Sequence, residues 1–185
     1  MSDPVSALGG KTYDGFAQIR EVGPLGMVSL RCDLAEKALP ALVKSIVGSK
    51  IPTPRMIEIK GEKAVGWMSP DELLILMPYQ DVAKAIDNIG KKLSEVHHLV
   101  VDVSDARAVF KVSGPKAAEV LMKLAPVDLH TMAAGELRRT RVAQVAAAFW
   151  KDADGFTLVS FRSVAGYVMG LLEHSAQVGS DLQLR

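Results

Sequence analysis

The stretch from Val100 to Pro115, VVDVSDARAVFKVSGP, constrains the fold more than any other part of this chain. Apolar runs predict a strand on each side of Ser104-Asp105, whose side chains favour a turn because they can bond the backbone two residues further on. In the second strand every other side chain is apolar and shares one face: Ala108, Phe110 and Val112. We therefore predict a hairpin whose second strand is buried on this face.

A helix is predicted directly after the hairpin. Pro115 suits the first position of a helix, where a missing N–H has no cost and the φ angle of proline is already helical. The apolar residues that follow recur on one face: Ala118, Val120, Leu121 and Leu124. We expect this face to pack against the preceding strands.

The pattern of apolar residues predicts the same order of elements in each half of the chain: a strand, a helix, three strands and a helix. In the first half, strands are expected near 27–31, 56–59, 63–68 and 73–77, and the clearest helix over 81–96. In the second half, strands are expected near 99–103, 108–112, 140–143, 146–150 and 156–161, with helices over 115–124 and 164–173. The hairpin gives the second half one extra strand.

These elements predict an α+β fold of two fused two-layer α/β sandwich halves, mostly antiparallel sheets with helices packed on one face. The expected division is a flexible N-terminal arm at 1–15, a first α+β half at 16–96 and a second at 97–185. One helix has two possible starts. Asp33 and Glu36 have the spacing of a capping box, but Pro40 follows, so the helix either kinks there or restarts at the proline.

Composition and charge exclude several classes of function. The 185 residues suffice for one domain or two small fused ones, and 49% of them are hydrophobic. A net charge of +1 predicts no nucleic-acid and no membrane partner. The single cysteine, Cys32, excludes an internal disulfide framework and fits the reducing cytoplasm. Met1 to Lys11 lacks the pattern of a signal peptide, so we expect a cytoplasmic location.

No complete catalytic or metal-binding set occurs in the sequence. No Gly-x-Gly-x-x-Gly motif follows a strand, so a Rossmann site for a flavin or nicotinamide is not expected. His97 and His98 are adjacent and would point to opposite faces of a strand, which does not suit a metal site. Cys32 has no Cys-x-x-Cys partner, and an inert buried thiol is the better interpretation. We expect no catalytic residue and no metal ligand on this chain.

Five segments in order make the sequence similar to the gamma subunit of heterotetrameric sarcosine oxidase. They are WMSPDELL at 67–74, VVDVSDARAVFKVSGP at 100–115, PVDLH at 126–130, RRTRVAQ at 138–144 and FRSVAGY at 161–167. The similarity covers about 30–167. Part of the pattern, in the second half, also resembles the folate-binding half of glycine-cleavage aminomethyltransferases.

The resemblance to the gamma subunit implies an accessory, non-catalytic chain in an oxidoreductase complex. That complex would oxidise sarcosine to glycine with oxygen, produce hydrogen peroxide and transfer the one-carbon unit to tetrahydrofolate. The partners implied are the larger subunits, above all the alpha subunit. FAD, FMN, NAD and tetrahydrofolate would be bound on these other subunits, with no cofactor on this chain.

Asp102 is a candidate folate contact, because folate-dependent relatives use a carboxylate to hydrogen-bond the pterin. It lies on a predicted apolar strand and could equally satisfy backbone or arginine groups of the turn, which is the favoured interpretation. The sequence also lacks the second half that completes the folate cavity of the transferases. The alternative function is that of a stand-alone folate-binding aminomethyltransferase-like protein. A third possibility is a homodimeric scaffold unrelated to any oxidase.

Basic and aromatic side chains near the end of the chain predict a partner interface. Arginine beside an exposed aromatic residue is typical of protein–protein contacts, whereas alternating arginines alone are more often a solvated strand face. Such arginines could also pair with carboxylates or with a phosphate. The predicted interface residues are Arg138, Arg139 and Arg141 on one strand, Phe149 and Trp150 at the end of another, and Arg162 on a later strand.

Overall fold

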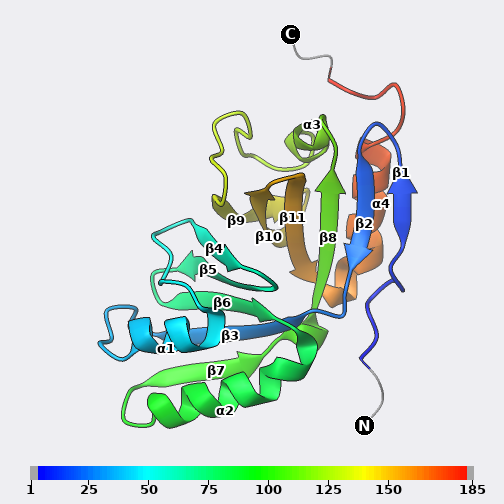
Figure 1. The fold of residues 1–185 in the computed structure, drawn as a ribbon. Coiled ribbons are helices and arrows are strands. Elements are labelled where there is room, and N and C mark those ends of the chain that lie inside the picture. Colours follow the sequence, from blue (N-terminus) through cyan, green and yellow to red (C-terminus); the bar gives the residue numbers. More distant parts are fainter. Residues whose placement is uncertain (1–3, 183–185) are drawn as a thin grey trace. The chain divides into compact units, whose positions relative to one another are not determined.

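The computed structural model describes residues 4–182, which form two compact units. One unit consists of residues 24–104, and the other, here called the two-segment unit, combines residues 4–23 with 105–182. Each unit contains one antiparallel sheet with two α-helices packed on one face, as Figure 1 shows. The predicted α+β class with mostly antiparallel two-layer halves is therefore confirmed.

The sheet of the 24–104 unit has five strands in the order β4-β5-β6-β3-β7. Its elements are β3 (Gly26–Cys32), α1 (Leu39–Val47), β4 (Ile57–Lys60), β5 (Lys63–Ser69), β6 (Glu72–Met77), the 3-10 helix η1 (Tyr79–Asp81), α2 (Val82–Lys92) and β7 (His98–Asp102). The apolar stripe predicted for the second helix packs on this sheet, and Val82 and Ile89 of α2 are buried together with Leu93 just beyond it.

Helix α1 begins at Leu39, with Pro40 in its first turn, where the missing N–H of proline has no cost. The helix therefore begins next to the proline and is not kinked by it. The expected capping box is wrong. Asp33 and Glu36 each accept a hydrogen bond from the amide two residues further on, at 2.9 and 3.2 Å, and so stabilise turns that precede the helix.

The sheet of the two-segment unit has six strands in the order β1-β2-β8-β11-β10-β9. Its elements are β1 (Thr12–Asp14), β2 (Gln18–Val22), β8 (Arg107–Ser113), α3 (Ala117–Met122), β9 (Leu137–Val142), β10 (Val145–Asp152), β11 (Gly155–Phe161), the 3-10 helix η3 (Arg162–Val164) and α4 (Ala165–Ser175). Helices α3 and α4 cover the face that contains Phe110, Phe149 and Leu158, all fully buried. The predicted inward face of β8 is confirmed.

The two strands of the opening stretch do not form a hairpin, contrary to the prediction. Strand β7 pairs with β3, whereas β8 pairs with β11 and β2, so the chain passes from one sheet to the other at the 3-10 turn η2 (Ser104–Ala106). The hydroxyl of Ser104 accepts a hydrogen bond from the amide of Met27 at 2.9 Å, which holds this turn against β3. Turn residues permit a change of direction, but they do not select the strand that pairs next.

Strand exchange also explains why the units differ from the expected division at residue 96. Strand β2 precedes β3 in the chain but pairs with β8, and β7 precedes β8 but pairs with β3. Residues 98–102 therefore belong to the 24–104 unit, and residues 4–23 belong to the two-segment unit. The pairing rests on backbone hydrogen bonds between segments far apart in sequence, which local periodicity does not reveal.

Glu21 on β2 holds the N-terminal segment. Its side chain is 2% exposed, and its carboxylate accepts hydrogen bonds from Ser6 Oγ at 2.9 Å and from the amides of Leu8 and Gly10 at 3.0 and 2.7 Å. Hydrogen bonds to a carboxylate are stronger than neutral ones, and these three satisfy a buried charge. The arm expected to be flexible is thus structured from Ser6 onward, and its first three residues lie outside the described part of the chain.

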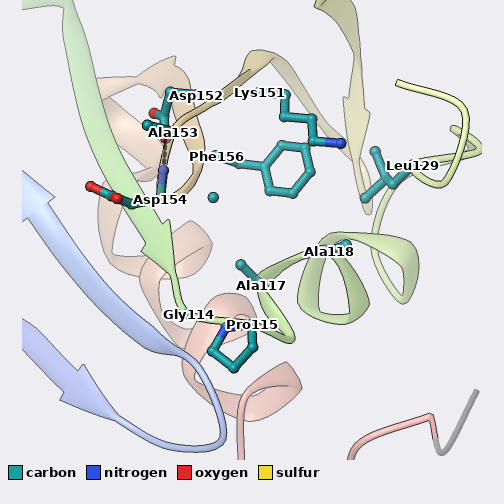
Figure 2. Close-up of a pocket in the computed structure, with 11 residues that line it drawn as sticks. Gly114, Pro115, Ala117, Ala118, Leu129, Lys151, Asp152, Ala153, Asp154 and Phe156 are labelled. Carbon is teal, nitrogen blue, oxygen red and sulfur yellow. Dashed lines mark hydrogen bonds between the residues drawn. The ribbon is translucent and has the colours of Figure 1, made fainter. Parts of the chain in front are cut away.

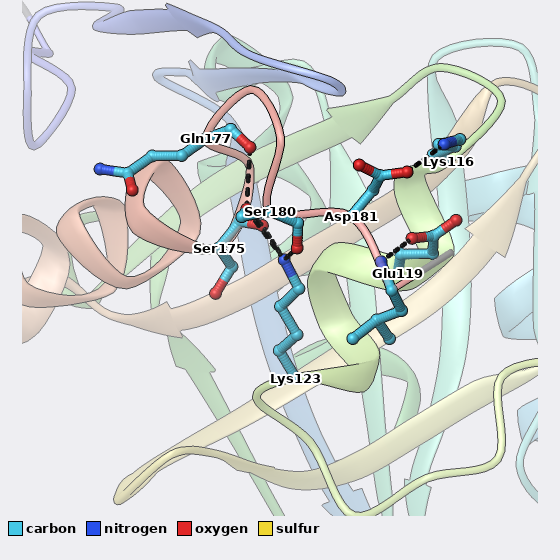
Figure 3. A network of polar contacts seen from close by, with 8 residues as sticks. Lys116, Glu119, Lys123, Ser175, Gln177, Ser180 and Asp181 are labelled. Atoms are coloured by element: carbon cyan, nitrogen blue, oxygen red, sulfur yellow. Dashed lines mark hydrogen bonds and ion pairs between the residues drawn. The ribbon is translucent and has the colours of Figure 1, made fainter. Parts of the chain in front are cut away.

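The C-terminal segment after α4 runs along the outer side of α3, as Figure 3 shows. Lysine and glutamate side chains of α3 and its flanks contact this segment and the end of α4. Lys123 Nζ donates hydrogen bonds to the carbonyl oxygens of Ser175 and Ser180. Lys116 forms an ion pair with Asp181, and the carboxylate of Glu119 accepts a hydrogen bond from the amide of Leu182. Lys123 also lies over the ring of Phe16, 4.9 Å from its centre. These contacts connect α3 with the chain on both sides of it.

Candidate partner interface

Strand β9 carries three of the predicted interface arginines and forms one edge of its sheet. Arg138 lies opposite Phe149 on the helix-covered face, and its guanidinium pairs with Glu136 at 2.5 Å. Arg139 and Arg141 are exposed and lie on the other face of the sheet. The strand therefore offers two exposed arginines, and its third arginine is held by an ion pair.

Phe149 and Trp150 do not present an aromatic surface. Phe149 is 0% exposed beneath α3 and α4, where its ring meets that of Phe156 edge to face at 6.3 Å. Trp150 points to the opposite face of the sheet and is 5% exposed. The sequence-based expectation of exposed aromatic side chains at this strand end is not met, because alternation along the strand does not show what covers each face.

An exposed aromatic side chain lies instead at Phe161, the last residue of β11. Its ring is 47% exposed, and the guanidinium carbon of Arg107 lies 4.3 Å from its centre. The two residues are register partners on β11 and β8. Arginine stacked on an aromatic ring in this way is a favourable cation–π pair. The combination of arginine and exposed aromatic that the sequence placed at residues 149–150 is found here.

Strand register extends this pair into a row across four strands. Ala147 pairs with Ser160, which places Ala146 level with Phe161, and Ala146 pairs with Arg141 on β9. Neighbouring strands are about 4.8 Å apart, so Arg141 lies roughly 10 Å from Phe161 on the same face. We call Arg107, Phe161, Ala146 and Arg141 the Phe161 row, and its last three members are exposed. The row combines one apolar ring with two cations.

Arg162 follows this row in the chain but lies in η3, not on a strand as expected. Its guanidinium donates to the carbonyl oxygen of Ser6 at 3.2 Å. Arg162 therefore holds the N-terminal segment beside the end of β11, together with Glu21. The sequence did not reveal this role, because the two residues that it connects lie at opposite ends of the chain.

Asp102, the folate candidate, is exposed at the end of β7. Its Oδ1 accepts hydrogen bonds from the amide and the hydroxyl of Ser104, at 2.9 and 2.6 Å. These contacts are those of the favoured structural interpretation, in which the carboxylate stabilises the turn between the sheets.

Within residues 4–182, no group of three or more histidine, cysteine and acidic side chains is placed to hold a metal ion. The ring of His98 contacts the carbonyl oxygen of Val96 at 2.8 Å. Cys32 is buried, and that burial, with the nearby Asp33 and Glu36 charges, raises the pKa of its thiol, which disfavours the reactive thiolate. None of the helices in the same part of the chain is long and apolar enough to cross a membrane.

A polar cluster lies on the same face as the Phe161 row, at the other end of the strands. Burial alone would raise the pKa of the Asp152 carboxyl, but hydrogen bonds from Lys111 Nζ at 2.5 Å and Thr157 Oγ1 at 2.7 Å outweigh it. The pKa of Asp152 is therefore held below its ordinary value. The cluster is a neutralised ion pair that joins β8, β10 and β11.

Asp152→Asn is expected to reduce the free energy of unfolding by about 1.5–3 kcal/mol at pH 7, the usual contribution of hydrogen bonds to a charged group. Because the folded-state pKa is depressed, this contribution is fully present above the unfolded value of about 4 and is lost as pH falls through the folded value. Urea unfolding at several pH values should show the difference from wild type shrinking below about pH 4. Asp87→Asn, in an exposed pair with Lys91, is the control and should change stability by less than about 0.5 kcal/mol throughout. A difference that persisted unchanged in acid would contradict the assignment.

Comparison with known sequences gives one family. The model of the family described as "Sarcosine oxidase, gamma subunit family" matches residues 31–177. Sarcosine oxidase subunit gamma of Corynebacterium sp. (strain P-1) is 30% identical over 145 residues, which cover 76% of this chain and 70% of the relative. The subunit of the same name from Arthrobacter sp. is 29% identical over 147 residues, with the same coverage.

Solved structures give the same fold at lower sequence identity. Heterotetrameric sarcosine oxidase from Corynebacterium sp. U-96, in complex with pyrrole 2-carboxylate, matches with a TM-score of 0.78 and 22% identity over 86% of this chain and 83% of the matched chain. Glycine cleavage system aminomethyltransferase T from Bartonella henselae matches with a TM-score of 0.65 and 10% identity, over 85% of this chain and 45% of that one. At these identities, the likeness concerns the fold alone.

Proposed function

Because this chain belongs to the sarcosine oxidase gamma subunit family, we propose that it is an accessory, non-catalytic subunit of a sarcosine oxidase complex. The match over residues 31–177 carries the proposal, since it includes every strand and helix from α1 to α4. The raised pKa of the Cys32 thiol and the hydrogen bonds that hold Asp102 in its turn support a role without chemistry of its own.

In this proposal the whole complex converts sarcosine to glycine in the cytoplasm, reduces oxygen to hydrogen peroxide and passes the one-carbon unit to tetrahydrofolate. FAD, FMN, NAD and tetrahydrofolate are bound by the larger subunits. This chain contributes a folded scaffold and a contact surface for a larger subunit, foremost the alpha subunit. The name of the matched heterotetrameric enzyme supports assembly with other chains.

The Phe161 row is the surface best suited to that contact. An exposed ring beneath arginine supplies apolar area together with charge, which is the composition of interface hot spots. Arg141 lies in the row, and its charge favours an acidic partner surface; Arg139 lies on the same face of β9. The interface proposed from sequence is thus kept for these arginines and moved from Phe149 and Trp150 to Phe161.

Co-expression of the chain with the larger subunits, followed by affinity capture and gel filtration, tests the proposal. We expect a stable complex whose flavin absorbance comes from the larger subunits, and an isolated chain that is colourless and without oxidase turnover. A chain that never co-purifies with them would contradict the subunit assignment. Tetrahydrofolate binding by the isolated chain, lost in Asp102→Asn, would favour the stand-alone folate-binding alternative instead.

Phe161→Ala is expected to weaken binding to the larger subunits by about 2 kcal/mol, the scale of an interface hot spot. The melting temperature of the isolated chain should change little, because the ring is already half exposed. Tyr167→Ala is the matched control, since Tyr167 is 51% exposed on α4 but lies outside the row. Binding isotherms for both variants decide the outcome, and equal losses would place the contact elsewhere.

A further inference from the structure

The two-segment unit contains a cavity of about 390 Å³ that the Phe161 row does not include. Figure 2 shows it between the start of α3 and the turn that joins β10 to β11. Phe156, Ala117 and Leu129 line it and are each no more than 3% exposed, so the base of the cavity is apolar. A volume of this size lies within the range of pockets that accept a compact apolar group.

The walls of the cavity are held in place before any partner binds. The amide of Gly114, at the start of α3, donates to the carbonyl oxygen of Asp154 in the opposite turn at 3.1 Å. Gly155 has a φ angle of +148°, and a Cβ there would lie 2.2 Å from the carbonyl oxygen of Val112. Glycine therefore lets the turn approach β8 closely, and the cavity is preformed, which lowers the entropic cost of binding.

The charged side chains at the rim have different kinds of partner. The carboxylate of Asp152 is paired with Lys111, and Lys151 Nζ donates to the carbonyl oxygen of Met132. Asp154 is exposed, and its carboxylate has no hydrogen bond or ion pair within residues 4–182. Its backbone is bonded on both sides, because the amide donates to Asp152 and the carbonyl oxygen accepts from the amide of Gly114. Within residues 4–182 the rim thus carries two charges without a counter-ion, the ammonium of Lys151 and the carboxylate of Asp154, and the latter points away from Phe156 and Ala117 in Figure 2.

We propose that this cavity receives one large apolar side chain of a larger subunit, with a lysine or arginine of that subunit beside it to pair with Asp154. The inference rests on the subunit function proposed above and adds a second contact to it. Burial of an aromatic or leucine side chain on Phe156 supplies the hydrophobic contribution. The carboxylate of Asp154 selects a basic neighbour through charge complementarity and adds specificity.

Filling the cavity tests the apolar part of the proposal. Ala118 lines the cavity and is half-buried. The phenylalanine ring that Ala118→Phe introduces would therefore occupy the space that we propose for the partner's side chain. We expect this variant to bind the larger subunits at least about 30-fold more weakly in a binding isotherm, the scale of losing one hot-spot side chain. Ala83→Phe makes the same change at an exposed position of α2 and should bind as wild type does.

Reversing the rim charge tests the electrostatic part. Asp154→Lys should slow association and weaken binding about 10-fold at low salt, with a smaller difference at high salt because exposed charges are screened. Glu62→Lys alters net charge equally at an exposed turn of the 24–104 unit and is the control. Melting curves of all four variants show whether each remains folded, and Asp154→Lys still decides the matter if Ala118→Phe does not fold.

The outcomes separate this inference from the proposed function. Selective weakening by both cavity variants supports the inference, and wild-type binding by Asp154→Lys and by folded Ala118→Phe overturns it while leaving the subunit assignment intact. A wild-type chain that does not bind the larger subunits overturns both. If Ala118→Phe abolishes self-association of the isolated chain and leaves subunit binding unchanged, the occupant is a second copy and the inference is wrong.

Discussion

Phe110→Ala is expected to lower the free energy of unfolding by about 3–5 kcal/mol, the loss typical of a truncated buried aromatic side chain. Phe110 is 0% exposed on β8, a strand bonded on both sides, by β2 and β11. Its ring belongs to the core that α3 and α4 cover, so its removal leaves a cavity that surrounding strands cannot readily close. Urea unfolding followed by circular dichroism measures the change.

Phe161→Ala provides the matched control for this measurement. It removes the same ring from the neighbouring strand β11, but at a position that is 47% exposed. Loss of its contact with Arg107 should reduce the free energy of unfolding by less than about 1 kcal/mol. If Phe110→Ala also lost less than that amount, the assignment of the buried face of β8 would be wrong.

Fragments 1–96 and 97–185, the halves predicted from sequence, are expected to lack cooperative unfolding transitions when each is expressed alone. The cut separates β7 from its partner β3 and β2 from its partner β8. The second fragment also loses Ile19, a fully buried member of its core. Unpaired strand edges and an exposed core face favour unfolded or aggregated chains over a stable fold.

An equimolar mixture of the two fragments is the control, because it restores both strand pairs without a covalent link. We expect the mixture to regain a cooperative thermal transition and near-ultraviolet circular dichroism that neither fragment shows by itself. A cooperative transition in the isolated 97–185 fragment would show that β2 is dispensable. Residues 105–182 of the two-segment unit would then fold without residues 4–23.

The positions of most helices and strands could be predicted from the sequence alone. The inward face of β8 and the apolar stripe of α2 follow from alternation and from helical periodicity, which are local properties. The order of a strand, a helix, three strands and a helix is present in both units, from β3 to α2 and from β8 to α4. The fold class and the family therefore followed from residues close together in the chain.

Strand β2 shows where local patterns become insufficient. Its helix-covered face contains Ile19 and then Glu21, a charged residue that removes the apolar alternation expected of a buried strand. The burial of Glu21 depends on hydrogen bonds from Ser6, Leu8 and Gly10, and sequence spacing gives no sign of them. The strand was missed for this reason, and the segment before it was expected to be flexible.

Only the tertiary structure decided which strands pair and which aromatic side chains remain exposed. Phe149 and Phe161 both lie on alternating strands, yet one is covered by α3 and α4 and the other ends its strand on the opposite face. Likewise, the turn after β7 permits either a hairpin or a passage to another sheet. Pairing partners and covering helices come from distant parts of the chain, so burial and the candidate interface depend on contacts that local sequence does not encode.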